Sequence, residues 1–372
     1  MMMSTILNLR HTLSFILLVG ILGSPSFLLS QEAVQDSGAF SISGFADLYA
    51  GYDFGNPNNG TRPDFIYNHH RVREFNLNLG YLRLAYQKAR YEGVVTLQTG
   101  TYAQANYAAE PVVLRSINEA RISVGLGAAN NWRLDAGIMP SNVGFESAVS
   151  ADNWTLTRSI SAENSPYYMS GIKVRRQNLG NWEIGGVLMN GWQKIRKPNG
   201  SRLPWMGTMA QYAPSERFKI SWNTLSGTDE RRLDRGWRMF SNLYGIVQLN
   251  SKLGMILGFD IGWQQDGQNL QNGRSWLVPT GILRYGLSNK LALALRGEYF
   301  KDGEAVILAN GAAIGGVSLN LDYQPFPELF ARIEGKFYQA DRPVFVGANN
   351  PSQQNFAITA SLALRMEKIW GN

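Results

Sequence analysis

The sequence predicts an all-β fold, a single closed antiparallel transmembrane β-barrel of about sixteen strands. Three observations predict it: sixteen segments alternate between apolar and polar residues, short turns and long loops alternate between these segments, and aromatic residues collect near the segment ends. After Gln31 no apolar run approaches the roughly eighteen residues of a membrane-spanning helix. A closed barrel satisfies all of its backbone N–H and C=O groups internally, as a lipid environment requires.

The N-terminal segment, residues 1–30, has the layout of a secretory signal peptide. Arg10 precedes an apolar run from Leu13 to Leu22, and small or turn-forming residues continue to Ser30. This run is shorter than the roughly twenty residues that a membrane-spanning helix needs, so cleavage is favoured over an uncleaved anchor. Leu28 is larger than the residue usual at this place, which leaves the exact bond open. We expect a signal peptide at 1–30 and an outer-membrane barrel at 31–372, exported through the periplasm of a Gram-negative bacterium.

The composition excludes several classes of function. Cysteine is absent, so neither a disulfide framework nor a cysteine-ligated metal site can form. The formal net charge of +7 is spread along the chain rather than clustered, which argues against nucleic acid as a partner. A hydrophobic content of 44% suits a barrel with one lipid face and one watery face, although a large soluble β-sandwich could share it.

Two-residue alternation defines the strands, because successive side chains of an extended strand point to opposite faces. Phe40, Ile42 and Leu48 share one face, for example, while Ser41 and Asp47 occupy the other. The segment 205–213 alternates least, and without it and one neighbour the barrel would have fourteen strands. The predicted strands cover residues 39–54, 74–86, 91–103, 115–126, 132–140, 168–176, 182–191, 205–213, 218–226, 236–249, 253–265, 275–286, 291–300, 313–323, 329–338 and 356–370.

The connections between these segments alternate in length. The seven connections after even-numbered segments are tight and rich in Gly, Asn, Pro and Ser, as turns require. The eight connections after odd-numbered segments are longer, and Ser141 to Tyr167 is the longest. Bacterial barrels have short periplasmic turns and longer outer loops, so the pattern predicts an even-numbered barrel with both ends in the periplasm.

Aromatic residues favour the two membrane interfaces and predict two girdles. The second segment is irregular, since its apolar positions change phase between Tyr81 and Leu82, which predicts a β-bulge or a strand that rises above the lipid. The predicted girdles consist of Trp132, Trp182, Tyr86, Tyr91, Tyr285, Tyr323 and Trp370 at the periplasmic side and of Tyr52, Phe54, Trp205, Trp237, Trp263, Trp276 and Tyr299 at the outer side.

The longest loop, 141–167, is the best candidate for a constriction, because a sixteen-stranded barrel is wide enough for a water-filled channel. Within it, residues 152–161 are expected to form a short helix with Asp152 as the N-cap. Glu146, Asp152, Arg158 and Glu163 of this loop would then face charges on the lumen wall. The alternative is a loop that packs on the outer rim.

Strand parity places further charged residues on the lumen side. Their signs are mixed and nearly balanced, which predicts weak or slightly anionic selectivity, since strong selectivity needs a ring of one sign. The alternative is that most of these charges only pair across neighbouring strands. The candidate pore-lining residues on the strands are Arg83, Glu119, Arg121, Arg133, Asp135, Lys173, Arg175, Arg296, Glu298, Arg332 and Glu334, and the same parity adds Asp260, Asp322, Lys336 and Arg365.

The two histidines beyond residue 30 favour neither a metal site nor catalysis. His69 and His70 are adjacent, so their side chains point in different directions and make a poor metal pair. An enzyme would need one of them held beside a nucleophile or a carboxylate. We expect rim or loop-packing residues instead, with no metal and no cofactor.

Two stretches carry a specific family resemblance: Asp152 to Ser159, with the sequence Asp-Asn-Trp-Thr-Leu-Thr-Arg-Ser, and Ser165 to Tyr168, with the sequence Ser-Pro-Tyr-Tyr. Weaker matches occur at Glu74 to Leu79, Gly144 to Ser147 and Asn190 to Gln193. These stretches resemble the outer-membrane β-barrel porin family described as OmpL-like. The resemblance covers mainly the first half of the chain and implies an outer-membrane protein with a porin role, without defining the solute.

These observations predict a porin for passive diffusion of small hydrophilic solutes, without catalytic chemistry. The expected partners are outer-membrane lipid, the solutes and the barrel-assembly machinery, and a homotrimer is expected by analogy with other sixteen-stranded porins. Two alternatives remain: an outer-membrane enzyme with its site at the barrel rim, and a closed barrel that displays loops for adhesion or assembly.

Overall fold

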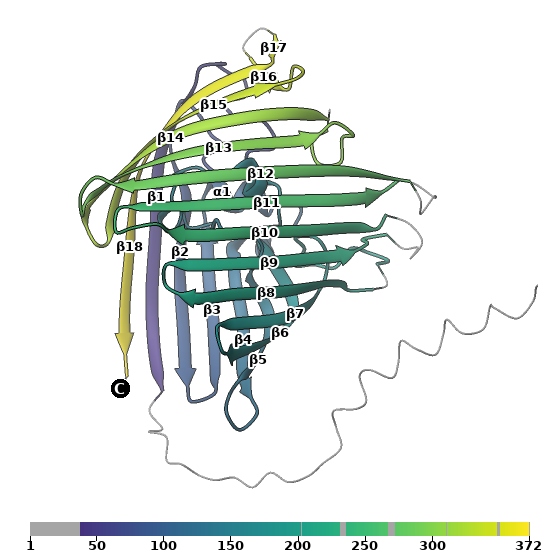
Figure 1. Ribbon diagram of the computed structural model, residues 1–372, viewed down its shortest axis with the longest axis vertical. Helices are drawn as coiled ribbons and strands as arrows, with labels where there is room; N and C mark the ends of the chain where they lie inside the picture. The colour runs from purple at the N-terminus through teal and green to yellow at the C-terminus, as the bar shows by residue number, and fades with distance from the viewer. Residues whose placement is uncertain are drawn as a thin grey trace, which may run out of the picture. The chain divides into compact units, whose positions relative to one another are not determined.

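The computed structural model describes residues 38–371 apart from 202, 231–235, 267–271, 310 and 348–349. Sixteen strands, each antiparallel to its neighbours, form one closed barrel in which the last strand pairs with the first (Figure 1). The predicted signal peptide at residues 1–30 lies outside the described residues. None of the helices in the described part of the chain is long and apolar enough to span a membrane.

The barrel strands follow one another in chain order around the ring, and β16 and β17 form a separate two-stranded hairpin. The elements are β1 (Ala39–Asp53), β2 (Phe75–Lys88), β3 (Tyr91–Thr99), α1 (Thr101–Asn106), the 3-10 helix η1 (Val112–Ser116), β4 (Ile117–Leu126), β5 (Trp132–Pro140), the 3-10 helix η2 (Ser150–Asp152), α2 (Ile160–Glu163), β6 (Tyr168–Leu179), β7 (Trp182–Met189), β8 (Trp205–Ser215), β9 (Phe218–Gly227), β10 (Arg238–Gln248), β11 (Leu253–Gln265), β12 (Gly273–Gly286), β13 (Leu291–Asp302), β14 (Ala312–Phe326), β15 (Leu329–Ala340), β16 (Phe345–Val346), β17 (Pro351–Ser352) and β18 (Gln354–Trp370).

The sixteen-strand prediction is confirmed, and the fourteen-strand alternative is wrong, because β8 pairs with both β7 and β9. The predicted third strand, however, is too long. It ends at Thr99, and α1 follows after a sharp corner at Gly100, whose φ of 113° is a left-handed conformation. A Cβ at this glycine would lie 2.5 Å from the carbonyl oxygen of Asn78, so the chain turns here only because the residue is glycine.

The predicted irregularity of β2 is a β-bulge at Asn78. Asp47 of β1 pairs with Leu79, whereas Leu48 pairs with Leu77, so Asn78 is the additional residue. Beyond the bulge Leu79 points inward and is fully buried, and before it Phe75 points outward and is 94% exposed. The bulge therefore changes which side chains face the lipid, as the phase change of the sequence indicates.

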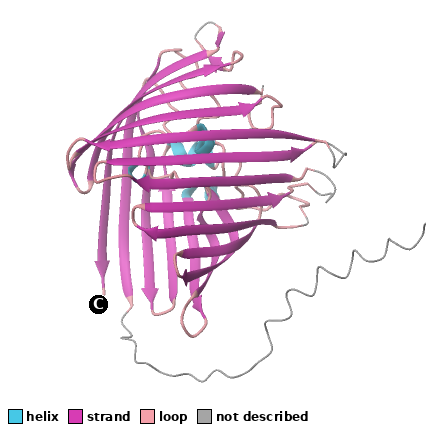
Figure 2. Ribbon diagram, viewed as in Figure 1, coloured by secondary structure: helices cyan, strands magenta, loops and turns pink. Residues whose placement is uncertain are grey.

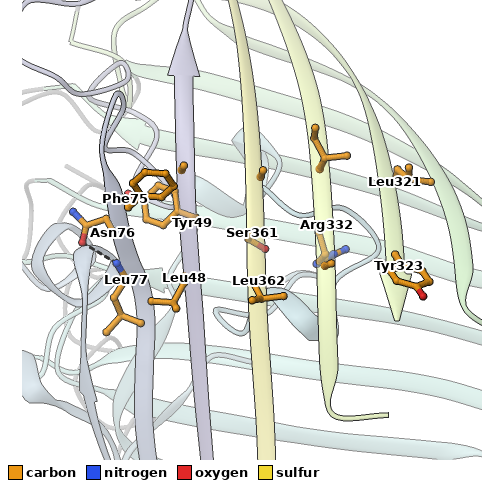
Figure 3. Close-up of a pocket in the computed structure, with 14 residues that line it drawn as sticks. Leu48, Tyr49, Phe75, Asn76, Leu77, Leu321, Tyr323, Arg332, Ser361 and Leu362 are labelled. Carbon is orange, nitrogen blue, oxygen red and sulfur yellow. Dashed lines mark hydrogen bonds between the residues drawn. The ribbon is translucent and has the colours of Figure 1, made fainter. Parts of the chain in front are cut away.

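The outer face of the barrel is apolar. Leu283, Leu295 and Leu319 lie side by side in register on β12, β13 and β14, and each is about half exposed. A hollow of about 880 Å³ lies on this outer face, with Leu48 and Leu362 among its lining residues (Figure 3). It is therefore a groove in the lipid-facing surface, not a part of the lumen.

The outer aromatic girdle is only partly as predicted. The periplasmic aromatic residues and Tyr52, Phe54 and Tyr299 are exposed on the outer face. Trp205 and Trp276, in contrast, are each 2% exposed and pack inside the barrel with other apolar side chains of its outer end. Both residues occupy strand positions that point into the barrel. Proximity to a strand end is therefore not sufficient to place an aromatic residue in a girdle. The inside of the outer end is thus largely apolar rather than watery.

Candidate functional site

The loop between β5 and β6, residues 141–167, folds into the barrel, where Figure 2 shows the helices enclosed by strands. The loop connects two adjacent strands, but it forms hydrogen bonds with the far wall of the barrel. The side-chain amide of Asn142 donates to Asn223 Oδ1 of β9 at 2.7 Å. The backbone N–H of Gly144 donates to Asn242 Oδ1 of β10 at 3.0 Å. The loop therefore crosses the lumen rather than packing on the outer rim. We name it the inner loop.

The predicted helix at residues 152–161 is wrong. The inner loop contains only η2 and the single turn α2, whose N-cap is Ser159 rather than Asp152. The reason is visible in its backbone hydrogen bonds: the N–H groups of Leu156, Thr157 and Ile160 donate to wall side chains instead of to carbonyls one helical turn back. Wall acceptors thus replace helical hydrogen bonds, and the segment stays extended.

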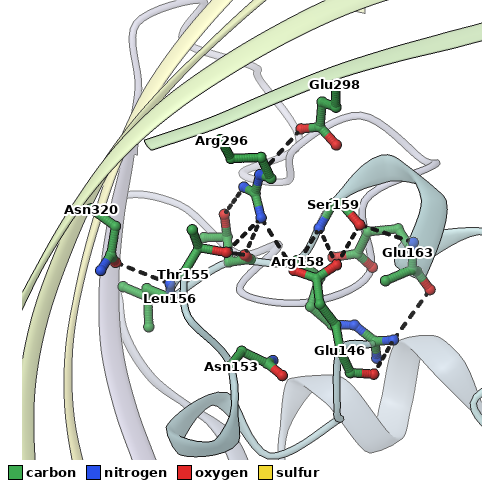
Figure 4. Close-up of polar contacts among 12 residues, drawn as sticks. Glu146, Asn153, Thr155, Leu156, Arg158, Ser159, Glu163, Arg296, Glu298 and Asn320 are labelled. Atoms are coloured by element: carbon green, nitrogen blue, oxygen red, sulfur yellow. Dashed lines mark hydrogen bonds and ion pairs between the residues drawn. The ribbon is translucent and has the colours of Figure 1, made fainter. Parts of the chain in front are cut away.

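Arg296 of β13 is the centre of the contact between the inner loop and the wall (Figure 4). Its side chain is 0% exposed, and its guanidinium lies 2.7 Å from Glu334, 3.3 Å from Glu146 and 3.6 Å from Glu298. It also donates to Thr155 Oγ1 at 2.7 Å. A buried charge needs such compensation, because desolvation of an unpaired ion is costly. Arg296 therefore ties the loop, through Glu146 and Thr155, to two wall carboxylates.

Further wall side chains bind backbone atoms of the inner loop. Lys336 of β15 donates to the carbonyl of Arg158 at 2.7 Å, and Arg332 of the same strand donates to the carbonyls of Ser150 and Asn153. The Ser150 hydroxyl donates in turn to Asp47 of β1 at 2.8 Å. The loop is consequently anchored along its length to one side of the barrel.

Asp152, in the periplasmic-facing part of the inner loop, forms an exposed ion pair with the wall. Arg365 of β18 contacts the carboxylate of Asp152, and the two side chains are 38% and 44% exposed. An exposed pair of this kind contributes little to stability because water and salt screen it. It differs in this respect from the buried cluster around Arg296.

Glu163 joins the inner loop to the first outer loop. Its carboxylate accepts hydrogen bonds from the backbone N–H of Tyr67 at 2.9 Å and from the Tyr167 hydroxyl at 3.0 Å. Burial raises the pKa of Glu163 above its ordinary value, although Arg158 and the Tyr67 N–H act in the opposite direction. The two loops therefore share one buried carboxyl group.

We predict that Glu163→Gln removes a pH dependence of stability. Because the pKa of Glu163 is raised in the folded protein, its contribution to stability is complete below its ordinary value of 4.5 and is lost as the pH rises through the raised value. Thermal unfolding between about pH 4 and pH 8 should thus show a larger fall in midpoint for the wild type than for the variant. Glu216→Gln, at an exposed turn residue, is the control. If the midpoint of thermal unfolding falls equally with pH in the wild type and in Glu163→Gln, the prediction is contradicted.

The two histidines lie in loop-packing positions. His69 is 1% exposed and its Nε2 lies 2.9 Å from Asp47 Oδ2, beside Tyr49. Nδ1 of His70 bonds to the carbonyl of Tyr67. Ser150 and His69 both bond to the same carboxylate oxygen, so they are not arranged as a nucleophile with its base. Among the described residues no group of His, Asp and Glu side chains could hold a metal ion.

The wall opposite the anchored side carries an ion-pair ladder that the inner loop leaves uncovered. Arg121 Nη1 lies 3.0 Å from Glu92, and Arg175 bridges Asp135 at 3.0 Å and Glu183 at 3.1 Å. We call this set the β2–β7 ladder. Its basic and acidic members are Arg83, Arg121, Arg133, Lys173, Arg175, Glu92, Glu119, Asp135 and Glu183.

The charged residues singled out in the sequence thus fall into two groups. Those of β11, β13, β14, β15, β18 and the inner loop lie in or around the contact between loop and wall, and those of β2 to β6 lie in the ladder. Exposure separates the two walls: the side chains of Arg83, Arg133 and Arg175 are 27%, 25% and 20% exposed, whereas those of Arg296 and Glu334 are 0% exposed. The loop is therefore off-centre, and water reaches the β2–β7 side.

Several residues that hold the loop were missed from the sequence. Asn242 and Asn320 accept hydrogen bonds from backbone N–H groups of the loop but carry no charge that would mark them in the sequence. Inward parity of β10 and β14 would have included them. Gly258 is less apparent still: the Phe145 ring lies so close that a Cβ there would come within 2.4 Å of it. A glycine between Leu257 and Phe259 carries no sign of such a contact.

A closed barrel of sixteen strands with an apolar outer face, charged inner walls and an inward-folded loop defines the porin class of channel proteins. The chain belongs to the family described as "Putative beta-barrel porin-2, OmpL-like". The model of this family matches residues 39–366. The resemblance found from the sequence is thereby confirmed, and it extends well beyond the first half. The family is one of outer-membrane porins, not of enzymes.

Solved structures show the same fold. The outer membrane channel DcaP of Acinetobacter baumannii has a TM-score of 0.58 at 13% identity, covering 88% of this chain and 98% of that one. The anion-selective porin from Comamonas acidovorans has a TM-score of 0.57 at 8% identity, with 89% and 99% covered. OmpT, an outer membrane protein of Vibrio cholerae, has a TM-score of 0.58 at 8% identity, with 88% and 98% covered. No curated protein sequence matches significantly.

Proposed function

We propose that the chain is an outer-membrane diffusion porin whose pathway runs between the inner loop and the β2–β7 ladder. Small hydrophilic solutes would pass through it without chemical change. The observation that carries the proposal is the unequal exposure of the two walls: the loop buries charges on β13 and β15 but leaves the arginines of the ladder in contact with water. Charged, hydrated groups along one wall of a narrow passage are suited to polar solutes.

The ladder also supports a weak selectivity. It contains five basic and four acidic side chains, and most of them form ion pairs with one another. Paired charges of nearly balanced sign create only a small average potential, which here is slightly positive. We therefore expect weak or slightly anionic selectivity.

The direct test is swelling of liposomes that contain the purified protein. With sugars of graded size, swelling should be fast for monosaccharides and should decline steeply for larger oligosaccharides, because the inner loop narrows the lumen. Swelling indistinguishable from that of empty liposomes would overturn the proposal. It would favour the closed, loop-displaying barrel, for which the full burial of Thr155, Leu156 and Ile160 within the inner loop is the supporting observation.

A charge-removal experiment tests the role of the ladder. The double variant Arg121→Gln, Arg133→Gln changes the net charge of the ladder from +1 to −1. The reversal potential in a KCl gradient should therefore move towards cation selectivity. The control is Lys301→Gln combined with Arg342→Gln, which removes the same charge from exposed positions on the outer face and an outer loop. This variant should leave the reversal potential unchanged. Equal potentials for the wild type and the ladder variant would contradict the proposed pathway.

The proposal includes the maturation and assembly of the protein. Residues 1–30 would be removed after export, and the barrel-assembly machinery would insert residues 31–372 into outer-membrane lipid. A homotrimer is the expected assembly, since porins of this size commonly form one. No cofactor or catalytic activity is part of the proposal.

A further inference from the structure

A recess of about 270 Å³ lies between the inner loop and the lumen wall. It is lined by the first arm of the loop, by α1 and β4 on one side and by β9 and β10 on the other. Five of its lining residues are aromatic, and its two basic side chains come from different elements, the loop and β9. The lining residues that matter here are Tyr102, Phe145, Arg158, Tyr167, Lys219 and Tyr244.

Arg158 is buried but incompletely bonded. It is 4% exposed, and its guanidinium carbon lies 3.5 Å from the centre of the Tyr167 ring. Only Nη2 has hydrogen-bond acceptors, the carbonyls of Ala162 at 3.3 Å and Glu146 at 3.5 Å. Nε and Nη1 have none, and no carboxylate of the described residues forms an ion pair with this guanidinium. Buried donors normally find a partner, so Arg158 retains unused hydrogen-bond donors beside the recess.

Lys219 supplies a second positive charge at the recess. It has inward parity on β9, and its Nζ lies 5.5 Å from the centre of the Tyr244 ring on β10. The Glu146 carboxylate, also at the recess, is occupied by Arg296 and by the backbone N–H of Ser159. The charge that remains available in the recess is therefore positive.

We propose that this recess is a binding subsite for a small aromatic carboxylate on its way through the channel. This inference rests on the proposed function, because it concerns a solute inside the lumen. The carboxylate would accept a hydrogen bond from one of the two unpartnered groups of Arg158, Nε or Nη1, and a hydrogen bond between two charged groups is stronger than one between neutral groups. The ring of the solute would pack against Phe145 and Tyr244, whose edges and faces accommodate another aromatic ring. Lys219 would attract the anion towards the recess.

The size of the recess sets the size of the solute. Pockets for drug-sized ligands have volumes of roughly 300 to 1,000 Å³, and the recess, at about 270 Å³, is smaller. It therefore suits a single ring with one carboxylate. A neutral aromatic solute would leave the Arg158 donors unpaired, and an aliphatic acid would leave the aromatic walls unfilled.

The test uses single-channel currents of the purified full-length protein with three probes: benzoate, benzyl alcohol and acetate. Benzoate should interrupt the current at concentrations at least about 10-fold lower than either of the other probes, because only benzoate offers both groups. Arg158→Gln should raise the half-blocking concentration of benzoate at least about 10-fold. Lys219→Gln, a wall substitution that removes no contact of the inner loop, should raise it about 3-fold. Lys301→Gln, on the outer face, should leave it unchanged.

The outcomes are distinguishable. Currents that benzoate affects no more than acetate overturn the inference and leave the porin proposal intact. The same holds for a block by benzoate that both Lys219→Gln and Arg158→Gln leave unchanged. If the Arg158→Gln variant fails to assemble, the half-blocking concentration of benzoate in Lys219→Gln alone decides whether the inference holds. Absence of any current overturns the porin proposal and the inference with it.

Discussion

Replacing Arg296 with alanine is expected to detach the inner loop from the wall and to widen the pore. The substitution removes the one cation shared by Glu146, Glu298 and Glu334, all of which stay buried. Breaking a buried ion pair by removing one partner typically costs about 3 to 5 kcal/mol, because an uncompensated charge is left behind. The loop can relieve this repulsion by moving Glu146 away from the wall. We expect a several-fold larger single-channel conductance together with a lower unfolding temperature.

The control for this experiment is Arg365→Ala. It removes an arginine that also binds the inner loop, through Asp152, but the pair is exposed. Exposed pairs contribute roughly 0 to 1 kcal/mol, so neither stability nor conductance should change much. If Arg296→Ala behaves like Arg365→Ala, the buried cluster does not hold the loop, and the account of the constriction is wrong.

Placing an arginine at Leu295 is expected to impair barrel stability strongly. Leu295 is 47% exposed, lies near the middle of β13 and has Leu283 and Leu319 beside it on the neighbouring strands. A charged side chain near the midplane of a barrel's lipid face costs about 2 to 4 kcal/mol. Equilibrium unfolding of the refolded protein in lipid vesicles would measure this loss.

Gln211→Arg is the matched control for Leu295→Arg. Gln211 of β8 faces the lumen, where it pairs in register with Glu183 of the ladder. An arginine there remains in water beside a carboxylate, so the change in the free energy of unfolding should be within about 0.5 kcal/mol. Similar losses for the two variants would mean that the two faces of the strands do not differ in environment.

The strands were predictable because two-residue alternation, turn composition and connection length are all local features. Even the phase change of β2 was visible, and the bulge at Asn78 explains it. The end of β3 was not visible, because Gly100 turns the chain where the apolar pattern continues to Tyr102. Position along the strand places Trp205 and Trp276 in the outer girdle, whereas their inward parity places them inside the barrel.

The inner loop was harder to predict than the strands. Its length marked it as a candidate constriction, but its internal structure depends on wall residues more than a hundred positions away, such as Asn320, which bonds to Leu156. The expected helix at 152–161 failed for this reason, since helix propensity takes no account of distant acceptors. Charged wall positions could be identified from parity, whereas their division between a buried cluster and a hydrated ladder depends on which side the loop occupies.

The central claim is that the lumen stays open beside the β2–β7 ladder although the inner loop fills the other side. The most direct measurement is the current across a planar lipid bilayer in KCl after addition of the purified protein. The account predicts discrete, reproducible conductance steps in the wild type and larger steps in Arg296→Ala. A bilayer that stays silent with correctly folded barrels of both proteins would contradict it.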